Sequence, residues 1–113
     1  MYQIQFTKSF EKQFKKLPKN IQAEVYDWSE ELQLKPFPKE SKILKGNWHG
    51  IVALHFHKRP EYRLLYLVTE SDDELQSGMI TLLMIATREQ MNNLYRLGRK
   101  RIKQILSSSI DMY

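Results

Sequence analysis

Hydrophobic and polar residues alternate at the start of the chain and then recur at helical spacing. The alternation over residues 2–6 predicts a first strand, because neighbouring side chains of a strand face opposite sides. Two amphipathic helices are predicted next, one on each side of Pro18. Their apolar positions are Phe10, Phe14 and Leu17 in the first, and Ile21, Val25, Trp28 and Leu32 in the second. Thr7 suits the N-cap of the first helix, and Pro36 ends the second. We therefore predict a strand followed by a helical hairpin that packs on a sheet.

The second half of the chain has the pattern of three strands and a last helix. Residues 39–50 form a polar connection, and strands are predicted at about 51–57, at about 62–68 and at Met79–Ala86. Thr87 and Gln90 have the spacing of a capping box, which predicts a helix that begins there. The element order β-α-α-β-β-β-α indicates one α+β domain over residues 1–113, with its helices on one face of the sheet.

Composition narrows the class of protein. A chain of 113 residues with 42% hydrophobic and 27% charged residues is typical of one globular domain. It has no cysteine, which excludes disulfides and thiol catalysis and fits a reducing compartment, so we expect a cytoplasmic protein. No apolar segment approaches membrane-spanning length. The formal charge of +5 favours nucleic acid, an anionic surface or an acidic protein as the partner.

The predicted strand at 51–57 carries the first candidates for chemistry. Its apolar residues alternate with Ala53, His55 and His57, so both histidines are expected on the face away from the core. Imidazole can take a proton from a ribose 2′-hydroxyl or protonate a leaving 5′-oxygen at neutral pH. The alternative is two solvated histidines. We expect no metal and no cofactor, since no carboxylate or third histidine has ligand spacing.

Arg63 lies inside the apolar run of the next predicted strand. A guanidinium there needs a partner or an anion, and it could hold a phosphate bidentately. The alternative is a salt bridge, for example to Glu61. If residues 58–61 form the loop, Arg63 shares the face of Phe56; if the loop spans 58–62 or carries a bulge, Arg63 joins the histidines. We expect the second arrangement because it groups the polar residues.

The predicted last helix adds further cations and a phenol. Arg88 stands at its start, where free backbone N–H groups favour anions. Tyr95 follows two turns later and could stack on a base or transfer a proton, or else pack in the core beside Leu94. The basic residues that follow are Arg96, Arg99, Lys100, Arg101 and Lys103. Charge of one sign suits contacts with phosphates, an acidic partner peptide or plain solvation.

Several short motifs occur in a characteristic order. They are the first strand with its helical hairpin, Lys42-Ile43-Leu44-Lys45-Gly46, Tyr62-Arg63-Leu64-Leu65-Tyr66 and Ala86-Thr87-Arg88-Glu89. In this order the chain resembles, over essentially its whole length, the RelE/ParE superfamily of bacterial type II toxins. The RelE-like and HigB-like ribosome-dependent mRNA endonucleases are the most similar branches.

That resemblance implies a small curved antiparallel sheet of about four strands, with the hairpin packed on it and a mobile last helix. It also implies a cognate antitoxin, and hence a toxin–antitoxin hetero-oligomer. Arg63 and Arg88 fall on the two arginine positions of the RelE-like enzymes, and Tyr95 lies one residue after their tyrosine. His55 and His57 replace the lysines of their basic strand if one residue is inserted in the following loop.

The resulting hypothesis is a toxin endoribonuclease that cleaves ribosome-bound mRNA by metal-free attack of the 2′-hydroxyl. His55 or His57 would transfer protons, Arg63 and Arg88 would hold the phosphate, and Tyr95 would stack or shuttle a proton. The predicted RNA-binding residues are Lys42, Lys45, Lys58, Arg96, Arg99 and Lys100. Two alternatives remain: a ParE-like poison of DNA gyrase that cuts no RNA, and a non-catalytic domain that binds RNA or a partner.

Overall fold

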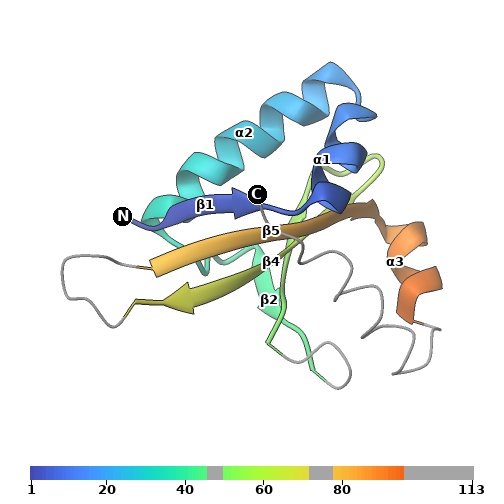
Figure 1. The fold of residues 1–113 in the computed structure, drawn as a ribbon. Coiled ribbons are helices and arrows are strands. Elements are labelled where there is room, and N and C mark those ends of the chain that lie inside the picture. The colour runs from blue at the N-terminus through green and yellow to red at the C-terminus, as the bar shows by residue number, and fades with distance from the viewer. Residues whose placement is uncertain (46–49, 72–77, 96–113) are drawn as a thin grey trace.

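The elements follow the predicted order, with one additional strand. The computed structural model describes residues 1–45, 50–71 and 78–95. Its elements are β1 (Gln3–Phe6), α1 (Lys8–Lys15), α2 (Lys19–Leu34), β2 (Ser41–Ile43), β3 (Val52–Phe56), β4 (Tyr62–Glu70), β5 (Gly78–Thr87) and α3 (Arg88–Tyr95). The α+β class and the helical hairpin predicted from the sequence are confirmed (Figure 1).

The sheet has five strands in the order β1-β5-β4-β3-β2 and is curved (Figure 1). Strands β2 to β5 pair in antiparallel fashion, whereas β1 is parallel to β5. The sheet is therefore mixed rather than wholly antiparallel. The prediction of a polar connection over residues 39–50 missed β2, which pairs with Val52–Leu54 along an edge of the sheet. Three residues are too short a run for alternation to be recognised, and their strand conformation depends on the β3 edge.

The helical hairpin covers one face of the sheet. Its buried residues Phe10, Ile21, Val25 and Leu32 pack against strand residues that alternate along the sheet. These strand residues are Val52, Leu54, Phe56, Tyr62, Leu64, Tyr66, Ile80, Leu82 and Ile85. The predicted stripes of both helices are thus the stripes that face the core, as amphipathic spacing requires.

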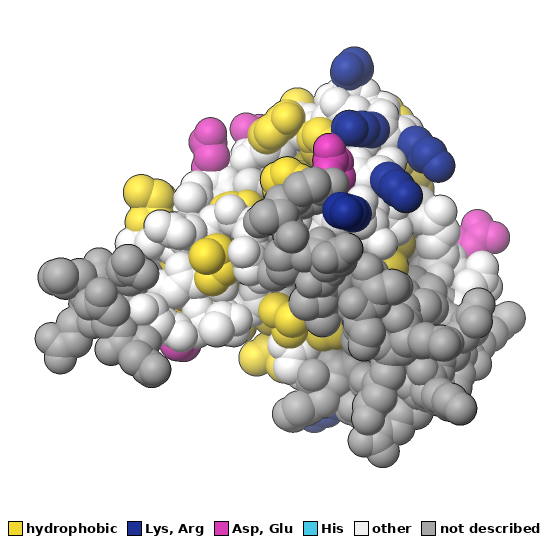
Figure 2. Space-filling model, in the orientation of Figure 1, with side chains coloured by type: hydrophobic (Ala, Val, Ile, Leu, Met, Phe, Trp, Pro, Cys, Tyr) yellow, Lys and Arg dark blue, Asp and Glu magenta, His cyan; other side chains and the backbone are white. Residues whose placement is uncertain are grey.

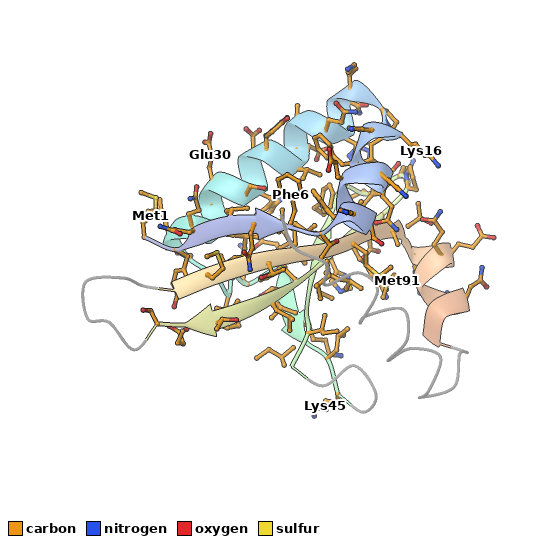
Figure 3. The ribbon with its side chains drawn as sticks, viewed as in Figure 1. Met1, Phe6, Lys16, Glu30, Lys45 and Met91 are labelled. Carbon is orange, nitrogen blue, oxygen red and sulfur yellow. The ribbon has the colours of Figure 1, made fainter. Side chains whose placement is uncertain are left out.

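A second core lies on the opposite face of the sheet, and the last helix, α3, packs there. It contains Met91 of α3, which is labelled in Figure 3, together with Ala53 and Leu65 and with Leu83 and Met84 of β5. The prediction that all helices lie on one face is therefore wrong. Strands covered on both faces read as nearly continuous apolar runs, and Met79–Ala86 is such a run. None of the helices in the described residues is long and apolar enough to cross a membrane.

Candidate functional site

The strand register brings His55 and Arg63 together. His55 lies directly opposite Arg63 in the β3–β4 pair, and Phe56 lies opposite Tyr62. Paired residues of neighbouring strands point to the same side, so both side chains lie on the face of Ala53 and Leu65. The connecting loop has the five residues that we predicted, but it spans 57–61 rather than 58–62, so Arg63 lies opposite His55 and not opposite His57.

Glu61 lies between these two side chains. Its Oε1 is 2.6 Å from Nδ1 of His55 and 3.9 Å from Nε of Arg63. The ion pair between Arg63 and Glu61 that the sequence left open is therefore present but long. Because a carboxylate only accepts hydrogen bonds, this contact favours the form of His55 with its proton on Nδ1.

Arg63 keeps a donor without a partner. Its side chain is 14% exposed, and its Nε is buried with no hydrogen-bond partner within the part of the chain that the structure describes. Leaving a charged donor unsatisfied is costly, commonly by more than about 1–3 kcal/mol. Because a fully buried Nε–H cannot be reached from solvent, contact with an anion such as a phosphate requires the guanidinium to shift or to offer its other N–H groups.

His57 departs from the predicted alternation. The strand ends at Phe56, and His57 has a φ of 62°, which is left-handed. Its Nδ1 lies 2.9 Å from Oε2 of Glu24 in α2, and its ring centroid lies 6.2 Å from that of Tyr62 on the hairpin side. The prediction that both histidines share the face of Arg63 is thus wrong for His57.

Both histidines nevertheless line one hollow of about 410 Å³, between the 57–61 loop and α2. Its lining residues are Glu24, Trp28, Glu40, His55, Phe56, His57, Lys58 and Glu61. The imidazoles are paired with carboxylates from different elements, Glu61 for His55 and Glu24 for His57. Within the described ranges, no group of three or more His, Cys, Asp or Glu residues is arranged to hold a metal ion.

Arg88 is joined to this site through the backbone. Its N–H donates to the carbonyl oxygen of Glu61 at 3.2 Å, and Thr87 lies opposite Tyr62 in the β4–β5 register. The predicted capping box is confirmed: the Thr87 N–H donates to Gln90 Oε1 at 2.9 Å, and the Gln90 N–H donates to Thr87 Oγ1 at 3.3 Å. The exposed Arg88 therefore begins α3 at the end of the sheet that carries His55 and Arg63.

The predicted RNA-binding residues are only partly described. Lys42 lies opposite Ala53 in β2, so it shares the face of His55, and Lys45 and Lys58 are exposed. The side chain of Tyr95 lies outside the described residues, as do Arg96, Arg99 and Lys100.

Sequence reasoning missed a second group of cations. Figure 2 shows lysine and arginine side chains gathered near the α1–α2 turn. The exposed lysines of this region are Lys8, Lys12, Lys15, Lys16 and Lys19. Glu11 is the one acid between Lys8 and Lys19, and it pairs with Lys15 at 3.1 Å. The sequence contains five lysines among the twelve residues 8–19, and this density of one charge could have indicated a basic surface.

Solved structures provide the remaining comparison, because no family model and no curated protein matches the sequence. A chain of the toxin–antitoxin complex RelBE2 from Mycobacterium tuberculosis is 25% identical, with a TM-score of 0.61, and covers 77% of this chain and 98% of its own. A double arginine-to-alanine mutant of Escherichia coli toxin RelE in the free state is 21% identical, with a TM-score of 0.63 and coverage of 89% and 97%. HP0894 from Helicobacter pylori is 22% identical, with a TM-score of 0.56 and coverage of 79% and 97%. These matches span nearly the full length of each neighbour, and the chain has the fold of the RelE superfamily.

Proposed function

We propose that this protein is the toxin of a type II toxin–antitoxin system and that it cleaves mRNA as a metal-free endoribonuclease. The observation that supports it best is the strand register, which sets Arg63 directly opposite His55. An anion site beside an imidazole suits a phosphodiester, and the similarity to RelE toxins supports the toxin role.

The proposed reaction is attack of a ribose 2′-hydroxyl on the neighbouring phosphorus, which leaves a cyclic or 3′-phosphate. Arg63 and Arg88 stabilise the charge that develops on the phosphate oxygens. His55 is the candidate for proton transfer at this phosphate, since it lies on the face of Arg63 whereas His57 is held by Glu24. Tyr95 remains a predicted stacking or proton-transfer residue.

Cations on several elements are available to bind RNA phosphates. Lys42 and Lys58 flank the site from β2 and from the 57–61 loop. Lys45 lies far from Lys16 in Figure 3, so the exposed lysines span much of the molecule. This spread suits a large structured RNA such as the ribosome, and we propose that mRNA is cut there. A cognate antitoxin that forms a hetero-oligomer with the toxin is the proposed protein partner, as in the RelBE2 complex.

Single alanine variants of Arg63 and Arg88 test the proposal. Each should lower the rate of mRNA cleavage by about 100-fold or more, because a preorganised donor to the transition state is lost. Expression of either variant should no longer arrest growth. Lys35→Ala, at an exposed cation beyond the end of α2, is the control and should remain toxic.

The readouts separate the proposal from the gyrase alternative. Primer extension on mRNA from induced cells detects cleavage, and induction of a DNA-damage reporter detects a gyrase poison. Intact mRNA together with DNA damage, or full toxicity of both arginine variants, would overturn the nuclease assignment.

A further inference from the structure

Glu61 contacts all three residues to which the proposed reaction assigns chemistry in the described part of the site. Its carboxylate lies 2.6 Å from His55 Nδ1 and 3.9 Å from Arg63 Nε. Its carbonyl oxygen accepts the N–H of Arg88 at 3.2 Å. One residue of the loop thus links β3, β4 and the start of α3.

The contact with His55 determines which ring nitrogen is free. Neutral imidazole has one N–H and one acceptor nitrogen, and a carboxylate on Nδ1 favours the form with Nδ1–H. Nε2 is then left with its lone pair. The side chains of His55 and Glu61 are 37% and 30% exposed, so the pair lies at the surface of the site and not in the core.

We propose, as a step that rests on the proposed nuclease function, that Glu61 is a positioning residue. It holds His55 in the Nδ1–H tautomer, so that Nε2 is the general base for the 2′-hydroxyl. It also stabilises the imidazolium that forms when the proton arrives. The carboxylate that the sequence offered as a salt-bridge partner of Arg63 thus acts on His55 in the proposed reaction.

The proposed step balances without a further reactant. The 2′-hydroxyl proton goes to Nε2 of His55 as the 2′-oxygen forms its bond to phosphorus. The bond from phosphorus to the 5′-oxygen breaks, and the leaving oxygen takes a proton from the solvent. His55 then returns its proton to the solvent.

Arg63 does not need Glu61 for its own role. At 3.9 Å the carboxylate is beyond hydrogen-bond distance of Nε, and that Nε–H has no hydrogen-bond partner in the described residues. The carboxylate can therefore remain on His55 while a phosphate approaches Arg63. The link to Arg88 uses the Glu61 backbone and survives a change of side chain. Substitutions of Glu61 hence address its carboxylate alone.

The test uses Glu61→Gln and Glu61→Ala with Glu24→Gln as the matched control. Glu24 offers the same chemistry, a carboxylate on Nδ1 of a histidine, but to His57. Long-range ¹H–¹⁵N spectra at about pH 8.5, where free imidazole is neutral, report which ring nitrogen carries the proton. The wild type should show His55 with Nδ1–H, and Glu61→Ala should shift His55 towards the Nε2–H form. Glu24→Gln should leave His55 unchanged.

Cleavage kinetics on programmed ribosomes complete the test. Both Glu61 variants should lower kcat about tenfold or more with little change in KM, because the base is mispositioned while RNA binding is kept. Glu61→Asp, which retains a carboxylate, should recover part of kcat and serves as the folded variant if alanine does not fold. Glu24→Gln should cleave at the wild-type rate.

Two outcomes are distinguishable. Wild-type kcat in the Glu61 variants, or an unchanged His55 tautomer, together with an inactive Arg63→Ala would overturn the role of Glu61 and leave the nuclease standing. Full activity of Arg63→Ala and Arg88→Ala would instead overturn the proposed function itself.

Discussion

At the scale of single residues, Thr7 joins two elements through one buried hydroxyl. Its Oγ1 accepts the N–H of Phe10 at 3.1 Å as the N-cap of α1 and donates to the carbonyl oxygen of Leu83 at 2.9 Å. Its own N–H donates to the carbonyl oxygen of Leu82 at 3.1 Å. The sequence predicted the cap but not the bonds to β5, because these depend on which strand lies beside β1.

Thr7→Val should therefore destabilise the protein by roughly 2 kcal/mol. Valine has nearly the same shape, but it leaves a buried N–H and a buried carbonyl oxygen without their partner. Thr7→Ser keeps the hydroxyl and should cost about 1 kcal/mol through its lost methyl group. Urea unfolding followed by circular dichroism measures both, and an equal loss in the two variants would contradict the role of the hydroxyl.

Tyr66 links stability to alkaline pH. It is fully buried and donates to the carbonyl oxygen of Pro36 at 2.7 Å, and burial raises the pKa of its phenol to about 12. The folded state holds the neutral form more tightly than the unfolded chain does, where the phenol titrates near 10. This contribution is thus complete below pH 10 and is lost as the pH rises towards 12.

Between pH 9 and pH 11, this phenol should lower the free energy of unfolding by about 1.4 kcal/mol. The free energy of unfolding of Tyr66→Phe should not show this decrease between pH 9 and pH 11. At pH 9 the variant should be about 1 kcal/mol less stable than the wild type, because the hydrogen bond of the phenol is gone. Other groups titrate alike in both proteins, so the difference between wild type and variant isolates Tyr66. A constant difference from pH 9 to pH 11 would contradict the shift.

The candidate site was predictable residue by residue only where strand geometry controls it. Alternation and a five-residue loop were enough to place His55 with Arg63. They did not predict His57, because a left-handed φ in a non-glycine residue follows from closure of the loop and from the contact with Glu24. The position of Glu61 beside His55 likewise depends on that loop conformation.

At the scale of elements, the long strands were predicted well and the short one was missed. β4 and β5 have nine and ten residues and apolar runs that mark them without any neighbour. β2 has three residues, and its pattern of exposure matches a loop as well as a strand. Strand conformation there comes from pairing with β3, which is tertiary information.

Gly78 is the position where the β4–β5 pair tolerates no side chain. Its φ is 126°, and a Cβ at this position would overlap the carbonyl oxygen of Thr69 across the pair. Gly78→Ala should thus cost roughly 3 kcal/mol in the free energy of unfolding. Gly50 also has a positive φ, 88°, but no atom of the described residues lies within 4 Å of the added Cβ, so Gly50→Ala should cost only about 1 kcal/mol. Comparable losses in urea unfolding of the two variants would contradict the steric argument.

At the scale of the whole molecule, the sheet separates two hydrophobic cores and contributes residues to both. The hairpin packs on one face through Val25 and Leu32, and Met91 of α3 packs on the other. Neighbouring residues of the same strand, such as Leu64 and Leu65, belong to different cores. A change on one face therefore reaches the other through strands that both faces share, and the described part should unfold as one cooperative unit.

Met91→Ala tests this coupling across the sheet. Met91 is fully buried in the second core, and its truncation should cost about 3 kcal/mol. Trp28 packs against the first core and can report on it once Trp48→Phe has made it the sole tryptophan. In the Trp48→Phe background, fluorescence of Trp28 and far-ultraviolet circular dichroism should give the same urea midpoint, and Met91→Ala should shift both equally. If Met91→Ala shifts the urea midpoint measured by circular dichroism but not the midpoint measured by fluorescence, the hairpin face folds independently of α3.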